Sequence, residues 1–453
     1  MRMEISRPDR YSRYLTAAAL IIALATYWRF REIDLSTVYA YVARHDVVRA
    51  ALLTDLSSSR SILWDFFGLL NRFLTPGSIE FLRIAGLVIT VLNFVLLSLM
   101  LGYVLGQWVW GTLLIFLLAL SPPAIIAAVT GGPAAVAATL VILYLLALYR
   151  NQYIFGGLLA AAALAAGLPG LIMFLVVVLD LLQNTQDRAR IIPKLLSASG
   201  AFLAVTVLIY FYSLYAGEAG LLTIPLGDHD LNWNLAGAVP LVLLGAFDIA
   251  GVVYLMVKNR FDVYKTHFHT FMLWVTFCAL SVVQPTTLNL FCALVVSSVL
   301  AAFFLQGFAS LWKWKYVSTG TFVFVVSLVF LFGDMYGSNK YLGDKISIET
   351  FEQDEAVDQV VKTIRTASGG ARIVTNFAAA QFAVRLHKPV IEIHSAFLPI
   401  ENFQDGGYGT IYIASNISKA DTLLSGCKEL FATTYTEDGR TLHLQVINCE
   451  ETK

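Results

Sequence analysis

The segment LRIAGLVITVLNFVLLSLMLGYV, residues 82–104, holds a single charged residue, Arg83, in an otherwise apolar run. A helix needs about 20 mostly apolar residues to cross the hydrocarbon core of a bilayer, so this segment predicts a transmembrane helix. The whole chain has the same character, because 58% of its residues are hydrophobic and only 14% are charged. Soluble domains carry about 25% charged residues. The composition therefore indicates an α-helical polytopic membrane protein.

Further apolar segments predict about 11 transmembrane helices in total. The first follows a basic N-terminus and lacks a small-residue cleavage site, so we expect a retained span and not a removed signal peptide. The stretch Gly167-Leu168-Pro169-Gly170 is either a turn between two short spans or a break in one long helix. The predicted spans are 14–30, 82–104, 107–122, 132–150, 153–168, 170–184, 194–216, 235–257, 267–283, 288–308 and 317–334.

The Lys and Arg residues of the short loops predict the orientation, because such residues concentrate on the cytoplasmic side. The N-terminus is rich in arginine, and counting spans from a cytoplasmic N-terminus puts every other basic loop inside as well. The opposite loops, at 121–131, 217–234 and 284–287, hold no Lys or Arg. Everything after residue 335 is then expected outside. The basic residues on the inner side are Arg2, Arg7, Arg10, Arg13, Arg150, Arg188, Arg190, Lys194, Lys258, Arg260, Lys265, Lys313 and Lys315.

Two regions depart from the membrane pattern. Residues 31–81 form a long first outside loop, whose spaced apolar residues among charges predict amphipathic helices along the membrane surface. Residues 336–453 have the charge density of a soluble protein and predict a small extracytoplasmic α/β domain, after a transmembrane domain over 1–335. Its expected elements are helices at 350–366 and 378–387 and strands at 371–376, 389–393, 410–415, 428–435 and 441–448.

The last two strands flank an Asp-Gly turn signal and predict a hairpin centred near Asp438. Cys427 and Cys449 are equidistant from Asp438, so they should face each other across the two strands. On an outside face they form either a disulfide or two free thiols. Cys278 and Cys292 fall in predicted spans, where we expect buried small hydrophobic residues.

The first outside loop holds the strongest candidates for chemistry. Glu32 and Asp34 directly follow the first span, where a carboxylate could act as general base toward a hydroxyl or amine acceptor; alternatively, Asp34 caps a helix. Arg44 and Arg60 could hold a lipid-linked phosphate at the interface, or form the polar face of amphipathic helices. The formal net charge of zero gives no indication of nucleic-acid binding.

Two further groups of polar residues are candidates. Asp228, His229 and Asp230 place two carboxylates and an imidazole together, a weak candidate for a divalent metal site. Asp248 is the acidic residue deepest inside a predicted span, and Asp180 lies nearer the end of another. Because an acid inside the membrane is costly, it is a functional candidate; hydrogen bonding to a neighbouring helix is the alternative for Asp248.

The layout of one span, a long outside loop opened by an acid, many further spans and an outside α/β domain resembles the GT-C superfamily of polytopic glycosyltransferases. The resemblance is to the branch of protein mannosyltransferases and aminoarabinose transferases and covers nearly the whole chain. That branch opens its loop with an Asp-Glu pair, an aromatic residue and an Ala-Arg-like pair. Here Asp34 precedes Leu35, with Tyr39, Ala43 and Arg44 at comparable positions.

Later segments are also similar to that branch. Arg60-Ser61-Ile62-Leu63-Trp64 keeps the basic residue, the leucine and an aromatic of the branch's Lys-Pro-Pro-Leu segment but lacks both prolines. Residues 77–84, GSIEFLRI, resemble a Gly-x-x-Glu-Phe-x-x-Arg stretch with the arginine one position early. Leu120-Ser121-Pro122 looks like the Ser-Pro at the end of the third span, and the glycines at 156–157 and 167–170 resemble the glycine-rich fifth and sixth spans.

The resemblance implies a glycosyltransferase that uses a polyprenyl-phosphate sugar as donor, with Asp34 as general base, Glu32 as the nearest second acid, and Arg44 and Arg60 on the phosphate. Leu35 replaces the second acid of the pair, which makes a non-catalytic GT-C-like scaffold or assembly subunit the alternative. Such a subunit would bind protein partners through the first outside loop or the C-terminal domain. A transporter is disfavoured, because the spans hold few acids and no paired broken helices.

Overall fold

The computed structural model describes most of the helical body and the strands of the C-terminal region. The described ranges are 80–105, 118–119, 121–130, 133–184, 188–215, 267–283, 286–311, 358–366, 372–375, 390–392, 410–415, 427–437 and 440–449, with interrupted pieces within 17–28, 244–253 and 382–388. The chain divides into two compact units, one built mainly from Arg83–Asp344 and one mainly from Lys345–Lys453. The described helices α6 to α14 lie in the first unit and the strands in the second.

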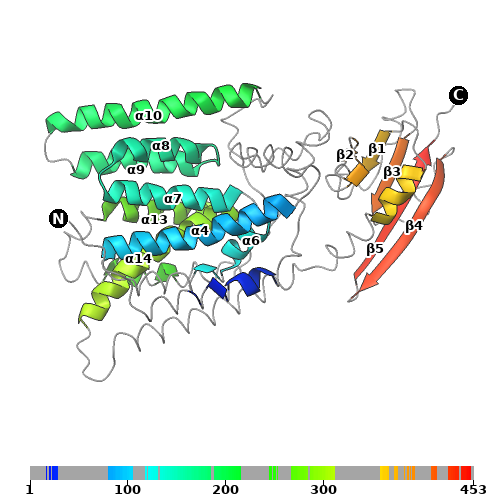
Figure 1. Cartoon of the computed structure of the whole chain (residues 1–453), viewed down its shortest axis with the longest axis horizontal. Coiled ribbons are helices and arrows are strands. Elements are labelled where there is room, and N and C mark those ends of the chain that lie inside the picture. Colours follow the sequence, from blue (N-terminus) through cyan, green and yellow to red (C-terminus); the bar gives the residue numbers. More distant parts are fainter. Residues whose placement is uncertain are drawn as a thin grey trace, which may run out of the picture. The chain divides into compact units, whose positions relative to one another are not determined.

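The helices of the first unit form because their sequences are apolar around their whole circumference, the pattern of buried or membrane-spanning helices. Within the described ranges, three helices are long and apolar enough to cross a membrane: α4, α10 and α14. Figure 1 shows the helices packed side by side. Their bounds are α4 (Glu80–Leu105), α6 (Pro122–Thr130), α7 (Pro133–Tyr149), α8 (Tyr153–Leu164), α9 (Pro169–Asn184), α10 (Arg188–Tyr215), α13 (Phe268–Val283) and α14 (Thr287–Leu311).

Burial separates an outer helix from a central one. In α10, only 11% of an 18-residue window within Ile191–Phe211 is buried, and large side chains such as Leu196, Leu203 and Phe211 are exposed. In α14, 78% of the Thr287–Phe304 window is buried. Figure 1 shows α10 along one side of the unit, next to α8 and α9. The outer helix therefore presents a face for lipid, and α14 forms part of the core.

The stretch around Gly167 is a tight turn between two separate helices. The backbone N–H of Gly167 donates to Leu164, and Gly167 takes a φ of 125°, which favours glycine. A Cβ on Gly170 would lie 2.1 Å from the backbone nitrogen of Leu164, so only glycine allows the two helices to approach this closely. Of the two predicted alternatives, the structure has the pair of short helices, α8 and α9.

The segment expected as the outside loop 121–131 contains a helix, α6. Ser121 precedes two prolines, and proline at the first helical positions is preorganised for helix formation. All residues from Ser121 to Val129 are buried. The prediction of a loop was wrong here. The segment is too short to be recognised as a span, and its lack of charged residues was interpreted as the mark of a non-cytoplasmic loop, whereas these residues are uncharged because they are buried. At nine residues, α6 is shorter than the roughly 20 needed to cross the bilayer.

Helices α8 and α10 pack at close range through a small residue. A Cβ on Gly157 of α8 would lie 2.4 Å from the backbone carbonyl oxygen of Ala198 in α10. Ala198 is fully buried. Small residues at such crossings let helix backbones approach closely, which is the main source of packing energy between helices in a membrane.

The second unit contains a five-stranded sheet in the order β2-β1-β3-β5-β4. Strand β1 pairs in parallel with β2 and β3, and β5 pairs antiparallel with β3 and β4. Each predicted strand is present, with ends that differ by at most two residues. The bounds are β1 (Arg372–Thr375), β2 (Val390–Glu392), β3 (Thr410–Ser415), β4 (Cys427–Glu437) and β5 (Arg440–Cys449).

The register of the final hairpin places the two cysteines opposite each other, as predicted, for a reason that the sequence did not reveal. Glu437 pairs with Arg440 at the end of the ladder. An unbroken ladder from that pair would place Cys449 opposite Lys428. A β-bulge at Leu430, between Glu429 and Phe431, shifts the register by one residue. The bulge brings the Cα of Cys427 opposite the Cα of Cys449.

We predict that Gly157→Ala lowers the melting temperature of the protein in detergent, because the added methyl group forces α8 and α10 apart. Overpacking of this kind costs about 1–3 kcal/mol. The matched control is Gly200→Ala in α10, where a Cβ meets nothing within 4 Å in the described structure. Alanine improves helix propensity by about 1 kcal/mol, so the control should keep or raise the melting temperature. Equal melting temperatures for the two variants would contradict the packing argument.

Candidate functional site

The residues that the sequence assigns to catalysis and to phosphate or metal binding lie outside the described residues. This holds for Glu32, Asp34, Arg44 and Arg60 in the first outside loop, and for the group Asp228, His229 and Asp230. The structure does describe parts of the helices next to the loop: residues of the first span up to Trp28, and α4, which begins at Glu80. Asp180, Asp248 and the backbones of the two C-terminal cysteines are also described.

Two buried hydroxyl groups lie in the helices that flank the first outside loop. Tyr27, in the first span, is only 3% exposed, and Thr90 of α4 is fully buried. Neither hydroxyl has a hydrogen-bond partner among the described residues. A buried polar group without a partner costs roughly 1–3 kcal/mol, so such groups are candidates for contacts with a bound molecule. Both belong to the halves of their helices that the sequence predicts toward the outside.

A polar contact joins α4 to α7 near Thr90. The Nδ2 of Asn93 donates a 2.7 Å hydrogen bond to the backbone carbonyl of Ala135, and the Thr139 hydroxyl donates to Oδ1 of Asn93 at 2.5 Å. Asn93 is 1% exposed. Because the surroundings are apolar, this contact fixes the relative rotation of α4 and α7. It therefore positions the helix that leads out of the first outside loop.

A second cluster of polar side chains joins α7, α9 and α13. Its centre is the buried pair His269 and Asp180, whose Nδ1 and Oδ1 lie 3.3 Å apart. The Tyr149 hydroxyl lies 2.7 Å from Oγ1 of Thr270 and 3.2 Å from Nδ1 of His267. The Tyr149 ring also meets the His269 ring edge-on, at 4.4 Å between centroids. We call these five residues the histidine cluster.

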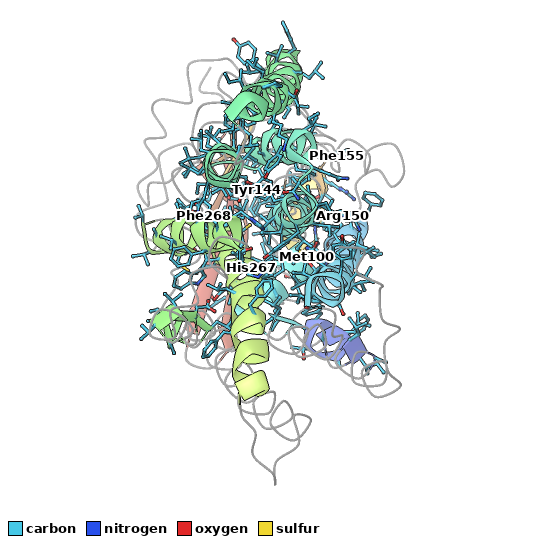
Figure 2. The ribbon with its side chains drawn as sticks, turned by 90° about the vertical axis from the view of Figure 1, so that its left-hand side faces the viewer. Met100, Tyr144, Arg150, Phe155, His267 and Phe268 are labelled. Atoms are coloured by element: carbon cyan, nitrogen blue, oxygen red, sulfur yellow. The ribbon has the colours of Figure 1, made fainter. Side chains whose placement is uncertain are left out.

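The histidine cluster lies at one end of the helical unit together with two basic residues. The guanidinium of Arg150 lies 4.8 Å from the Tyr103 ring centroid at the end of α4. The ammonium of Lys194 in α10 lies 5.4 Å from the ring of Tyr153, the first residue of α8. Figure 2 looks along the helices and labels Arg150 and His267. The orientation predicted from loop charges requires Arg150 and Lys194 to share one end, and they do.

The intramembrane acid Asp248 takes the structural alternative that the sequence left open. It is 1% exposed, and its Oδ2 accepts a hydrogen bond from the Ser297 hydroxyl of α14. Its Oδ1 has no partner among the described residues. The hydrogen bond ties the segment around residue 248 to the central helix. Asp248 therefore contributes to the packing of this segment against α14.

Sequence reasoning identified Asp180 as an acid near the end of a span but missed its partners. His267 and His269 were assigned only to the start of a span, and Tyr149 only to the end of one. The sequence did hold a signal for this contact, because the predicted spans put Asp180, His267, His269 and Tyr149 at the same end of the bundle. Within the described ranges, however, no group of three or more His, Cys, Asp or Glu residues could hold a metal ion. The histidine cluster is therefore not a metal site made of these residues.

No protein-family model and no curated protein matches this sequence. Among solved structures, the chain is similar to two crystal structures of ArnT from Cupriavidus metallidurans, one bound to undecaprenyl phosphate and one in the apo state. The TM-scores are 0.59 and 0.58, with 13% sequence identity in both cases. The similarity covers 95% of this chain and 97% of each ArnT chain.

At this level of identity the similarity establishes the fold. The chain has the fold of ArnT, in agreement with the resemblance seen in the sequence. The three long apolar helices and the membrane fold together support an integral membrane protein.

We predict strong energetic coupling between Asp180 and His269. Asp180→Asn and His269→Gln should each lower the free energy of unfolding in detergent, because each leaves a buried polar partner uncompensated. The double variant should lose less than the two single losses combined, with a coupling energy of about 0.5–3 kcal/mol.

The matched control is a second cycle that combines Asp180→Asn with Gly200→Ala, which has no described neighbour within 4 Å of its added Cβ. That cycle should be additive. Additivity in both cycles would show that the 3.3 Å contact between Asp180 and His269 contributes nothing to stability.

Proposed function

We propose that the protein is a membrane glycosyltransferase that moves a sugar from a polyprenyl-phosphate donor to an acceptor on the non-cytoplasmic face. The observation that carries this proposal is the shared fold with ArnT over 95% of this chain, since one of the ArnT structures is bound to undecaprenyl phosphate. The coverage of 97% of the ArnT chain means that both the helices and the C-terminal region have counterparts. A shared lipid carrier is the simplest function that uses this whole architecture.

The proposed chemistry assigns Asp34 as the general base, with Glu32 as the nearest second acid. The base takes a proton from an acceptor hydroxyl or amine as the acceptor attacks the anomeric carbon of the sugar. The bond between that carbon and the phosphate oxygen breaks, and polyprenyl phosphate leaves with the bonding electrons. General-base catalysis of this kind contributes typically about 10²–10⁴ in rate.

The leaving phosphate needs positive charge in a position that water does not fully screen. Arg44 and Arg60 are proposed to supply it, because guanidinium groups bind phosphate through two parallel hydrogen bonds. A divalent cation at Asp228, His229 and Asp230 is a second proposed source of positive charge. Carboxylate oxygens suit a hard cation, and histidine suits a transition metal.

The arrangement of the bundle supports placing this chemistry at the end away from Arg150 and Lys194. These two cations share the end that the loop charges assign to the cytoplasm. The hydroxyls of Tyr27 and Thr90, for which the described part of the chain offers no hydrogen-bond partner, belong to the helices that flank the first outside loop. We propose that these two hydroxyls face the lipid-phosphate or sugar part of the donor.

A non-catalytic scaffold or assembly subunit is the second candidate function, and Leu35 is the observation that favours it. The related branch has an acid at that position. A leucine removes one of the two carboxylates that could hold or deprotonate the acceptor. A scaffold would keep the fold and bind a protein partner through the first outside loop or the C-terminal region.

We predict that undecaprenyl phosphate raises the melting temperature of the purified protein. A ligand at 100 times its dissociation constant stabilises the folded state by about 2.7 kcal/mol. Arg44→Ala and Arg60→Ala should each reduce the shift. Arg10→Ala, on the predicted cytoplasmic side, is the matched control and should keep it. Undecaprenol without phosphate should give a smaller shift, and an equal shift with both lipids would argue against a phosphate site.

We predict that Asp34→Asn lowers sugar transfer about 10²–10⁴-fold while keeping the shift in melting temperature with undecaprenyl phosphate. The assay measures undecaprenyl phosphate released from donors that carry mannose or aminoarabinose, in the presence of membrane lipids as acceptors. Asp55→Asn, in the same loop, is the matched control and should keep full transfer. Full transfer by Asp34→Asn would remove this residue from the mechanism.

The same assay separates the enzyme from the scaffold. If the wild-type protein is purified alone as a monomer and transfers sugar, the scaffold hypothesis is ruled out. If the wild-type protein transfers no sugar from either donor and is purified in a stable complex with a second membrane protein, the scaffold hypothesis is supported.

A further inference from the structure

The open end of the β4–β5 hairpin places two cysteines directly opposite each other. The Cα of Cys427, the first residue of β4, pairs with the Cα of Cys449, the last residue of β5. Directly opposed residues in an antiparallel pair have Cα atoms about 4.5–5.5 Å apart. A disulfide needs a Cα separation of about 4.4–6.8 Å. The backbone register alone therefore meets the distance requirement of a disulfide.

The register depends on the bulge at Leu430. The pairing of Glu437 with Arg440 would otherwise leave the two cysteines one position out of register. Opposed residues lie on the same face of a sheet, whereas a shift by one residue moves a side chain to the opposite face. The bulge thus moves the two cysteines from positions on opposite faces of the hairpin, where a disulfide cannot form, to directly opposed positions, where it can.

The position of the pair in the sheet gives a cross-link a structural role. Strand β4 is at one end of the strand order, and its only described neighbour in the sheet is β5. Strand β5 is held on its other side by β3, where Cys449 pairs with Thr410. At one end of β4, Glu437 pairs with Arg440, which is only three positions away in the chain, and Cys427 lies at the opposite end of the strand. A covalent link there would fix an edge strand at the end where it can otherwise separate from β5.

We infer that Cys427 and Cys449 form a disulfide that fastens the edge strand β4 to the sheet. The inference rests on the proposed location of this region outside the cytoplasm, where disulfides persist. The two thiols lose two protons and two electrons as the S–S bond forms. A dithiol–disulfide oxidase of that compartment accepts them by thiol–disulfide exchange, and its own disulfide becomes two thiols.

The other two cysteines provide an internal comparison. Cys278 of α13 and Cys292 of α14 are free, and Cys292 is fully buried. Both belong to the helical unit. A method that reads the state of all four cysteines therefore contains its own reference for free thiols.

We predict that the full-length protein, purified without reductant and with N-ethylmaleimide present from lysis onward, contains the cross-link. Digestion after denaturation in the alkylating agent, followed by non-reducing mass spectrometry, should give one linked peptide pair that contains Cys427 and Cys449. Cys278 and Cys292 should be alkylated. Alkylation of all four cysteines would overturn the inference.

A relocated thiol tests the register. Moving the second cysteine by one residue, with Asn448→Cys and Cys449→Ser, places it opposite Lys428 and on the other face of β5. The linked fraction should fall at least tenfold, and an unchanged fraction would overturn the register argument. Cys278→Ser is the matched control and should leave the linked fraction unchanged. This readout does not depend on sugar transfer, so failure here is distinguishable from failure of the proposed glycosyltransferase activity.

Discussion

Lipid tails are as apolar as leucine, so hydrocarbon alone gives a membrane helix no reason to prefer one neighbour over another. In this protein the choice of neighbours rests on a few close backbone approaches and a few buried polar contacts. Gly157 lets α8 meet the backbone of α10, and Gly170 lets α9 follow α8 through a tight turn. The Tyr144 hydroxyl of α7 donates a 2.5 Å hydrogen bond to the backbone carbonyl of Met173 in α9. Such contacts define the bundle because the apolar majority cannot.

The polar contacts also give the two ends of the bundle different characters. One end gathers Arg150, Lys194 and the histidine cluster, all in contact with aromatic rings or with each other. Asn93 and Thr139 lie near the middle of α4 and α7. The hydroxyls of Tyr27 and Thr90, which have no hydrogen-bond partner among the described residues, lie in the halves of their helices that are farther from Arg150. The proposed transferase, which works on one leaflet, needs such an asymmetry. It must hold a charged lipid head group on one side and stay anchored on the other.

The sequence predicted the elements well and the contacts poorly, for physical reasons. A helix such as α4 or a strand such as β3 follows from local apolar patterning, and both have ends close to those predicted. The pair of Asp180 and His269 is separated by 89 residues, and no local pattern reports which helices meet. The bulge at Leu430 was not predicted, because no residue pattern around it distinguished a bulge from regular pairing. The catalytic assignments around Asp34 depend on side-chain placement outside the described residues, and they stay predictions.

The length of the α8–α9 hairpin has a consequence for the surrounding bilayer. Helix α8 has 12 residues, so at about 1.5 Å per residue it rises only about 18 Å, against a hydrocarbon thickness of about 30 Å. If Arg150 and Lys194 lie at the cytoplasmic interface, as the loop charges predict, α8 begins at that interface and the turn at Gly167 falls inside the hydrocarbon depth. The backbone carbonyls of an irregular turn cannot face acyl chains. On the proposed topology, protein or water and not lipid tails would occupy the space just beyond this turn.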